Sequence, residues 1–96
     1  MLIVRVIGTT ISTIKDEKLL GKKLMVVQPS DEFGKSSGKP FVAIDTVDAG
    51  VGDLVLTAAG SSARQTTITK DSPVDAVIMA VIDSLDVNGE ETFRKS

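Results

Sequence analysis

The stretch Leu2-Ile3-Val4-Arg5-Val6-Ile7 begins the chain with apolar and β-branched residues that only Arg5 interrupts. β-branched side chains pack well on a pleated surface, so this run predicts a β-strand. The pattern continues through Gly8 to Ile14, and a glycine inside a strand often marks a bulge or a kink. We therefore expect one long strand over residues 2–14, bent at Gly8.

Four further strands are predicted along the chain, each bounded by loop or turn residues. They cover residues 23–28, 41–45, 53–57 and 76–85, and Pro29 follows the first of them. Asn88-Gly89 is a two-residue hairpin signal. We expect this turn to return Glu91-Thr92-Phe93 as a short edge strand.

The connections between these strands differ in composition. Residues 30–39 are rich in Asp, Gly, Ser and Lys, which predicts a flexible hairpin loop. Asp48-Ala49-Gly50-Val51-Gly52 predicts a tight turn in which two glycines are free to adopt a positive φ. Residues 60–65 predict a short helical turn with a serine as its N-cap.

Residues 72–85 fit two kinds of secondary structure. Ser72-Pro73-Val74-Asp75 has the form of a capping box with proline at the first helical position, and apolar residues follow at helical spacing. The same run is dense in β-branched residues and apolar on every face, as a strand buried on both sides would be. Periodicity alone leaves helix and strand open for this segment, and the preference for a strand at residues 76–85 rests in part on the resemblance described below.

Five or six short strands at close spacing, with one brief helix, predict a small all-β barrel. A chain of 96 residues is bounded to one domain, so we expect residues 1–96 to form it. The longest apolar run, residues 76–82, is far shorter than the ~20 residues that span a membrane. The N-terminus lacks the pattern of a signal peptide, and a cytoplasmic location is therefore expected.

The composition argues against an enzyme. The chain has no histidine and no cysteine, which excludes a Ser-His-Asp triad, a Cys-His dyad and ordinary zinc or haem ligation. Residues 34–39 have only three residues between their glycines, one fewer than a phosphate-binding loop requires. Gly50-Val51-Gly52 lacks the third glycine of a dinucleotide fingerprint, because Val55 stands there. A Ser-Lys dyad or a carboxylate pair is still allowed by composition, but neither has a signature in this sequence. We therefore expect no catalytic residue, no metal ligand and no cofactor.

The charge and the aromatic content argue against a nucleic-acid partner. The formal net charge is −2, and no basic patch is visible in the sequence. A monomeric OB-type module that binds an oligonucleotide or a small ligand is the alternative function. It would need aromatic platforms and a basic groove, and the chain offers only Phe33, Phe41 and Phe93.

Two of the predicted strands are apolar on both faces. These are the first strand, with its run at residues 2–7, and the segment at residues 76–82. A small solvated barrel should alternate apolar and polar residues along each strand. The second apolar face therefore indicates burial against another subunit, or under the short helix.

The motifs together resemble one family. The first strand has the form Met-Leu-Ile-x-Arg-Val-x-Gly, and Lys-Leu-x-x-Val-Gln follows in the second. The more specific blocks are Ala49-Gly50-Val51-Gly52-Asp53, Gly60-Ser61-Ser62-Ala63-Arg64, Pro73-Val74-Asp75 and Val81-Ile82-Asp83. From residue 2 to about residue 83, the chain is similar to the EutN/CcmL family of bacterial microcompartment vertex proteins.

The resemblance implies a fold and a function. The fold would be an OB-like antiparallel β-barrel of about five strands with one short helix, and a strand from about residue 76. Such proteins are non-enzymatic, form pentamers with a narrow central opening, and close the vertices of a shell tiled by hexameric shell proteins. The tail at residues 86–96 is expected to vary between members. The candidate subunit-interface or pore residues are Ala49, Gly50, Val51, Gly52, Ser61, Ser62, Ala63, Arg64 and Asp75.

Overall fold

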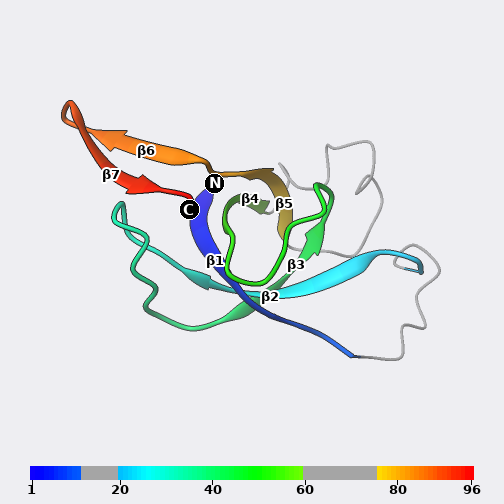
Figure 1. The fold of residues 1–96 in the computed structure, drawn as a ribbon. Helices are drawn as coiled ribbons and strands as arrows, with labels where there is room; N and C mark the ends of the chain where they lie inside the picture. The colour runs from blue at the N-terminus through cyan, green and yellow to red at the C-terminus, as the bar shows by residue number, and fades with distance from the viewer. Residues whose placement is uncertain (12–19, 60–75) are drawn as a thin grey trace.

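The computed structural model describes residues 1–11, 20–59 and 76–96, which contain seven strands (Figure 1). Their bounds are β1 Leu2–Thr9, β2 Lys23–Pro29, β3 Phe41–Asp45, β4 Leu54–Ala59, β5 Ala76–Val81, β6 Ser84–Val87 and β7 Glu90–Arg94. The strand predictions at residues 23–28, 41–45 and 53–57 are confirmed to within about two residues at each end. The predicted short helix at residues 60–65 and the end of the first strand at residues 12–14 lie outside the described residues.

Five of the strands close into a barrel in the order β1-β2-β3-β5-β4. The all-β barrel predicted from the sequence is confirmed. One pair departs from the antiparallel pattern, because β3 and β5 run parallel while the other four neighbouring pairs are antiparallel. The departure follows from geometry, since strand directions cannot alternate all the way round a ring with an odd number of strands.

The predicted bend of the first strand at Gly8 is confirmed as a β-bulge. Val6 pairs with Val27 and Gly8 with Val26, so Ile7 is an extra residue on β1. A bulge of this kind increases the local twist and bends the strand, which helps a sheet to close on itself.

The segment at residues 76–85 is a strand only in part. β5 ends at Val81, and Ser84 and Leu85 belong to the next strand, β6. The prediction of one strand through residue 85 is therefore wrong at its end. The last hydrogen bond that ties this segment to β4 runs from Ile82 N to Leu54 O at 2.8 Å, and the chain then leaves the barrel.

The C-terminal hairpin forms a separate two-stranded sheet of β6 and β7. Asn88 has a φ of 54° and Gly89 a φ of 81°, as a type I′ turn requires at both central positions. The prediction from Asn88-Gly89 is thus confirmed. The returning strand pairs with β6 and lies beside the barrel instead of extending its sheet (Figure 1).

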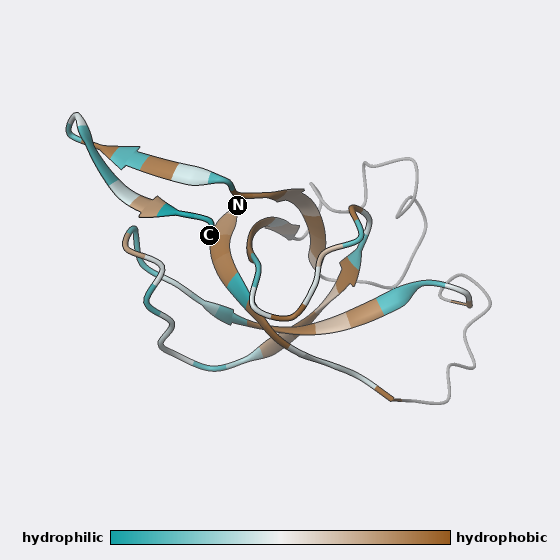
Figure 2. Cartoon of the chain, viewed as in Figure 1, coloured by the Kyte–Doolittle hydropathy of each residue, from teal (hydrophilic) through white to brown (hydrophobic). Residues whose placement is uncertain are grey.

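Alternating side chains of the five barrel strands fill the interior, and Figure 2 shows hydrophobic residues concentrated on these strands. This cluster is aliphatic and contains Val4, Val6, Met25, Val27, Ala43, Ala49, Val55, Ala76 and Ile78. A second cluster joins Ile44, Ala58 and Val77. Because Val77 lies between Ala76 and Ile78 on β5, this second cluster lies on the opposite face of the sheet. Part of the outer apolar face is therefore buried within the chain itself.

We expect Ile78→Ala to lower the free energy of unfolding by about 2–5 kcal/mol, because the side chain is fully buried and its loss leaves a cavity. Urea unfolding at one fixed protein concentration measures this change. Ile11→Ala is the matched control, since that isoleucine is fully exposed and its truncation should change stability by less than about 0.5 kcal/mol. Equal losses in the two variants would contradict the assigned core.

Candidate functional site

The connection between β3 and β4 contains the first block of candidate residues. Its first residue beyond the strand, Thr46, donates a hydrogen bond from Oγ1 to Ile78 O at 2.6 Å. Gly52 N donates to Val6 O at 2.8 Å, and Val6 N donates to Asp53 O at 2.9 Å. The connection is therefore fixed to β5 where it begins and to β1 where it ends.

Hydrogen bonds between Asp53 and Gly50 hold the tip of this connection together. Asp53 Oδ2 accepts a hydrogen bond from Gly50 N at 2.9 Å, and Asp53 N donates to Gly50 O at 3.0 Å. Asp48 and Gly52 have positive φ values of 58° and 98°. Of the two glycines that the sequence offered for this conformation, the turn uses Gly52, and Asp48 supplies the second left-handed residue.

The four candidates in this turn have different surroundings. Ala49 is buried and belongs to the interior cluster. Gly50, Val51 and Gly52 form an exposed tip, and Val51 keeps 62% of its surface accessible. The other candidates, Ser61, Ser62, Ala63, Arg64 and Asp75, lie outside the described residues.

A lysine on β2 holds the start of the turn. Lys23 Nζ donates to Asp48 Oδ1 at 2.9 Å and lies 3.4 Å from Asp45 Oδ2. The Asp45 side chain is only 1% exposed, and its Oδ1 accepts a hydrogen bond from Val47 N at 3.0 Å. The hydrogen bond to Asp48 raises the pKa of Lys23, and the same bond lowers the pKa of Asp48. The cation therefore compensates one buried and one exposed carboxylate.

An arginine on β1 holds the end of the turn. Arg5 Nη1 donates to Gly52 O at 2.8 Å, and Nη2 donates to Gly34 O at 2.5 Å. The guanidinium carbon also lies 5.6 Å from the centre of the Phe93 ring, within the range of a cation–π contact. Arg5 was not among the candidate residues. The signal that could have found it is its place as the one charged residue in an otherwise apolar strand.

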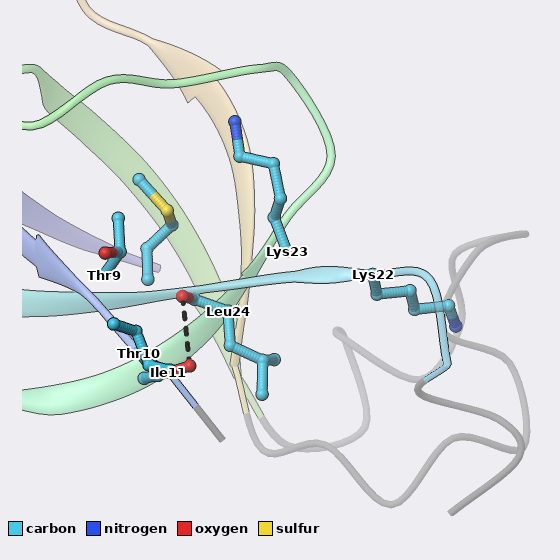
Figure 3. Close-up of a pocket in the computed structure, with 7 residues that line it drawn as sticks. Thr9, Thr10, Ile11, Lys22, Lys23 and Leu24 are labelled. Carbon is cyan, nitrogen blue, oxygen red and sulfur yellow. Dashed lines mark hydrogen bonds between the residues drawn. The ribbon is translucent and has the colours of Figure 1, made fainter. Parts of the chain in front are cut away.

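Among the cavities on the described surface, two adjoin the segments described above. One of about 350 Å³ lies where β1 ends and β2 begins, and Thr10 Oγ1 donates to Leu24 O across it at 3.5 Å (Figure 3). The other, of about 280 Å³, lies between Arg5, the end of the turn and the C-terminal residues 93–96. Within residues 1–11, 20–59 and 76–96, no cluster of acidic side chains is suited to hold a metal ion. The same ranges contain no helix long and apolar enough to cross a membrane.

The fold and the turn define a class of protein. It is a small closed β-barrel whose third and fourth strands are not neighbours and are joined by the connection described above. The family model described as ethanolamine utilisation protein EutN/carboxysome matches residues 1–83. The chain belongs to this EutN/CcmL family.

Curated relatives extend the similarity over nearly the whole chain. The chain is 41% identical over 95 residues to the carboxysome shell vertex protein CcmL of Synechococcus elongatus, covering 99% of the chain and 96% of that protein. It is 43% identical over 82 residues to the microcompartment shell vertex protein GrpN of Rhodospirillum rubrum, covering 85% of the chain and 92% of that protein.

Solved structures give the same result in three dimensions. CcmL of Gloeobacter violaceus superposes with a TM-score of 0.91 at 38% identity, with 99% of this chain and 98% of that chain covered. The GrpN pentameric microcompartment shell protein of Rhodospirillum rubrum superposes with a TM-score of 0.81 at 40% identity, with 91% and 99% covered.

We expect Gly52→Ala to lower the free energy of unfolding by about 1–2 kcal/mol, because a side chain at a φ of 98° is strained. No atom lies within 4 Å of the added Cβ, so the cost comes from the backbone and not from a clash. Gly50→Ala is the matched control and should be close to neutral, since its φ is not positive and its nearest neighbour, Asp53 Oδ2, lies 3.8 Å away. Urea unfolding measures both variants. An equal loss of unfolding free energy in the two would show that the positive φ of Gly52 is not the cause of the loss.

We expect Asp48→Asn to lower the melting temperature slightly at neutral pH and to leave it unchanged at low pH. Asparagine also adopts a positive φ readily, so the substitution removes the charge and keeps the turn. The pKa of Asp48 is lowered in the folded state, so its contribution is present above the ordinary value of 3.8 and is lost as the pH falls through the folded value. Thermal melts between pH 7 and about pH 2 test this, and a difference that persists at the lowest pH would rule out the ion pair as its cause.

Proposed function

We propose that this chain is a non-enzymatic structural subunit that assembles as a homopentamer and caps the vertices of a bacterial microcompartment shell in the cytoplasm. The observation that carries the proposal is the match over nearly the full chain to proteins named as shell vertex proteins, at 37–43% identity. Two of the similar structures, GrpN and the shell protein MSM0273, are described as pentameric.

The surface of the barrel supports assembly. Leu2, Ile7, Val42 and Met79 each leave between 38% and 49% of their surface accessible, although all four lie on barrel strands. A ring made of identical subunits needs two different patches on every subunit, one for each neighbour. Exposed apolar residues on several barrel strands can form two such patches.

The turn tip and the residues beyond β4 are proposed to form subunit contacts or to line the central opening. Gly50, Val51 and Gly52 are exposed and can meet a neighbour directly, whereas Ala49 supports the tip from inside the barrel. Ser61, Ser62, Ala63, Arg64 and Asp75 complete the proposed set. An arginine suits such a contact because its guanidinium presents five donors in a fixed fork.

The alternative of an OB-type binding module is less well supported. Of the three phenylalanines, Phe41 packs against the interior cluster and Phe93 lies beneath Arg5, which leaves Phe33 as the exposed ring. Nucleic-acid-binding OB folds use several aromatic side chains along a basic groove. A net charge of −2 adds no support for a polyanionic ligand.

Native mass spectrometry of the purified chain tests the proposal. We expect a species with the mass of five chains of 10.1 kDa each, and we expect Arg64→Ala to shift the population toward smaller species by about tenfold, the loss of one charge-assisted contact. Arg94→Ala is the matched control, since it removes an arginine paired with Glu91 within the hairpin. A wild-type chain that stays monomeric at micromolar concentration would contradict the pentamer.

Shell incorporation is tested by producing the chain together with hexameric shell proteins. Electron microscopy should then show closed polyhedral shells, and leaving out this chain should leave them open or irregular at their corners. Closed shells of the same size and shape without the chain would contradict a vertex role. This experiment also tests the proposed contact with hexamers.

A further inference from the structure

The C-terminal hairpin begins where the match to the family model ends. The model matches residues 1–83, and β6 begins at Ser84. The hairpin lies beside the barrel near both chain termini and is not part of the barrel sheet (Figure 1). Because a two-stranded hairpin is marginally stable alone, contacts with the rest of the chain must hold it in place.

β7 contacts the rest of the described chain. The Phe93 ring lies under the Arg5 guanidinium, and Thr92 Oγ1 donates to Glu32 O. At the base of the hairpin, Lys95 N donates to Asp83 O at 2.7 Å and extends the β6–β7 ladder. A Cβ at Gly34 would come within 2.8 Å of both Arg5 Nη2 and Phe93 Cδ1. The ring, the guanidinium and the loop backbone are therefore packed closely together.

The same groups reach the exposed turn tip by two routes. Arg5, which stacks on Phe93, donates from Nη1 to Gly52 O at 2.8 Å. Lys95 Nζ lies 3.7 Å from Asp53 Oδ1, and the other oxygen of that carboxylate accepts from Gly50 N at 2.9 Å. A cavity of about 280 Å³ lies between the turn and the last residues.

We propose that Arg5 and Lys95 are positioning residues through which the C-terminal hairpin holds the turn tip Gly50-Val51-Gly52 in one conformation. The hairpin then restrains the turn tip, and a partner that displaces the hairpin would also release the tip. The inference goes beyond the proposed function and does not depend on the number of subunits. It assigns to the C-terminal segment an effect on a part of the chain more than thirty residues away in sequence.

Amide hydrogen exchange of the full chain, followed by NMR, tests this proposal. Gly52 N is hydrogen-bonded to Val6 O and is the reporter. We expect Phe93→Ala to speed exchange at Gly52 about fivefold, the loss of one exposed cation–π contact, and to leave the β2–β3 ladder unchanged. Phe93→Tyr keeps an aromatic ring over Arg5 and should keep the wild-type rate. Val87→Ala, an exposed site on the same hairpin, is the matched control and should also leave the rate unchanged.

Each outcome decides the proposal when the variants are compared at a concentration that gives them the same oligomeric mass. Faster exchange at Gly52 in Phe93→Ala but not in Phe93→Tyr supports the proposal. Faster exchange confined to the hairpin overturns it. If Phe93→Ala loosens the whole barrel, Lys95→Ala decides, because it removes only the contact with Asp53 at the surface. Selective acceleration at Gly50 in that variant supports the proposal, and an unchanged rate overturns it.

Discussion

Closure of five strands into one barrel is the constraint on which the rest of the structure depends. Directions cannot alternate around an odd ring, so β5 lies between β3 and β4 and runs parallel to β3. Since β3 and β4 are not neighbours, a tight hairpin cannot join them. Their connection crosses the barrel opening instead (Figure 1), and Ala49 enters the interior cluster on the way. One topological requirement therefore accounts for both the buried Ala49 and the exposed tip of the connection.

Two cations fix this crossing connection at its ends. Lys23 on β2 binds Asp48 where the connection begins, and Arg5 on β1 binds Gly52 O where it ends. Charge-assisted hydrogen bonds are stronger than neutral ones, which suits a segment with two residues at positive φ. Arg5 lies on the face of β1 opposite to the interior residues Val4 and Val6, whereas Lys23 shares the face of Met25 and Val27 at the start of β2.

The family model covers the barrel but not the C-terminal hairpin. The family model matches residues 1–83, whereas the similarity to CcmL proteins covers 95 residues, so it extends into the hairpin. The hairpin is bound to the barrel through Arg5, a residue of its first strand.

Much of the architecture could be predicted from local sequence, because local patterns report local structure. The β-branched runs located the barrel strands, Gly8 located the bulge, and Asn88-Gly89 located the hairpin turn. The end of β5 was missed, since Ile82 and Leu85 continue the apolar spacing after the ladder to β4 has ended. The ladder ends there because its partner strand, β4, begins at Leu54.

The candidate site, too, was determined partly by local sequence and partly by the tertiary structure. The sequence by itself determined that residues 48–52 form a turn with left-handed residues, because glycine has no Cβ to oppose a positive φ. Only the tertiary structure decided that Asp48 and Gly52 adopt it, that Ala49 is buried, and that Arg5 joins Gly34, Gly52 and Phe93. Those residues are far apart in the chain, and the closure of the barrel is what brings them to one place.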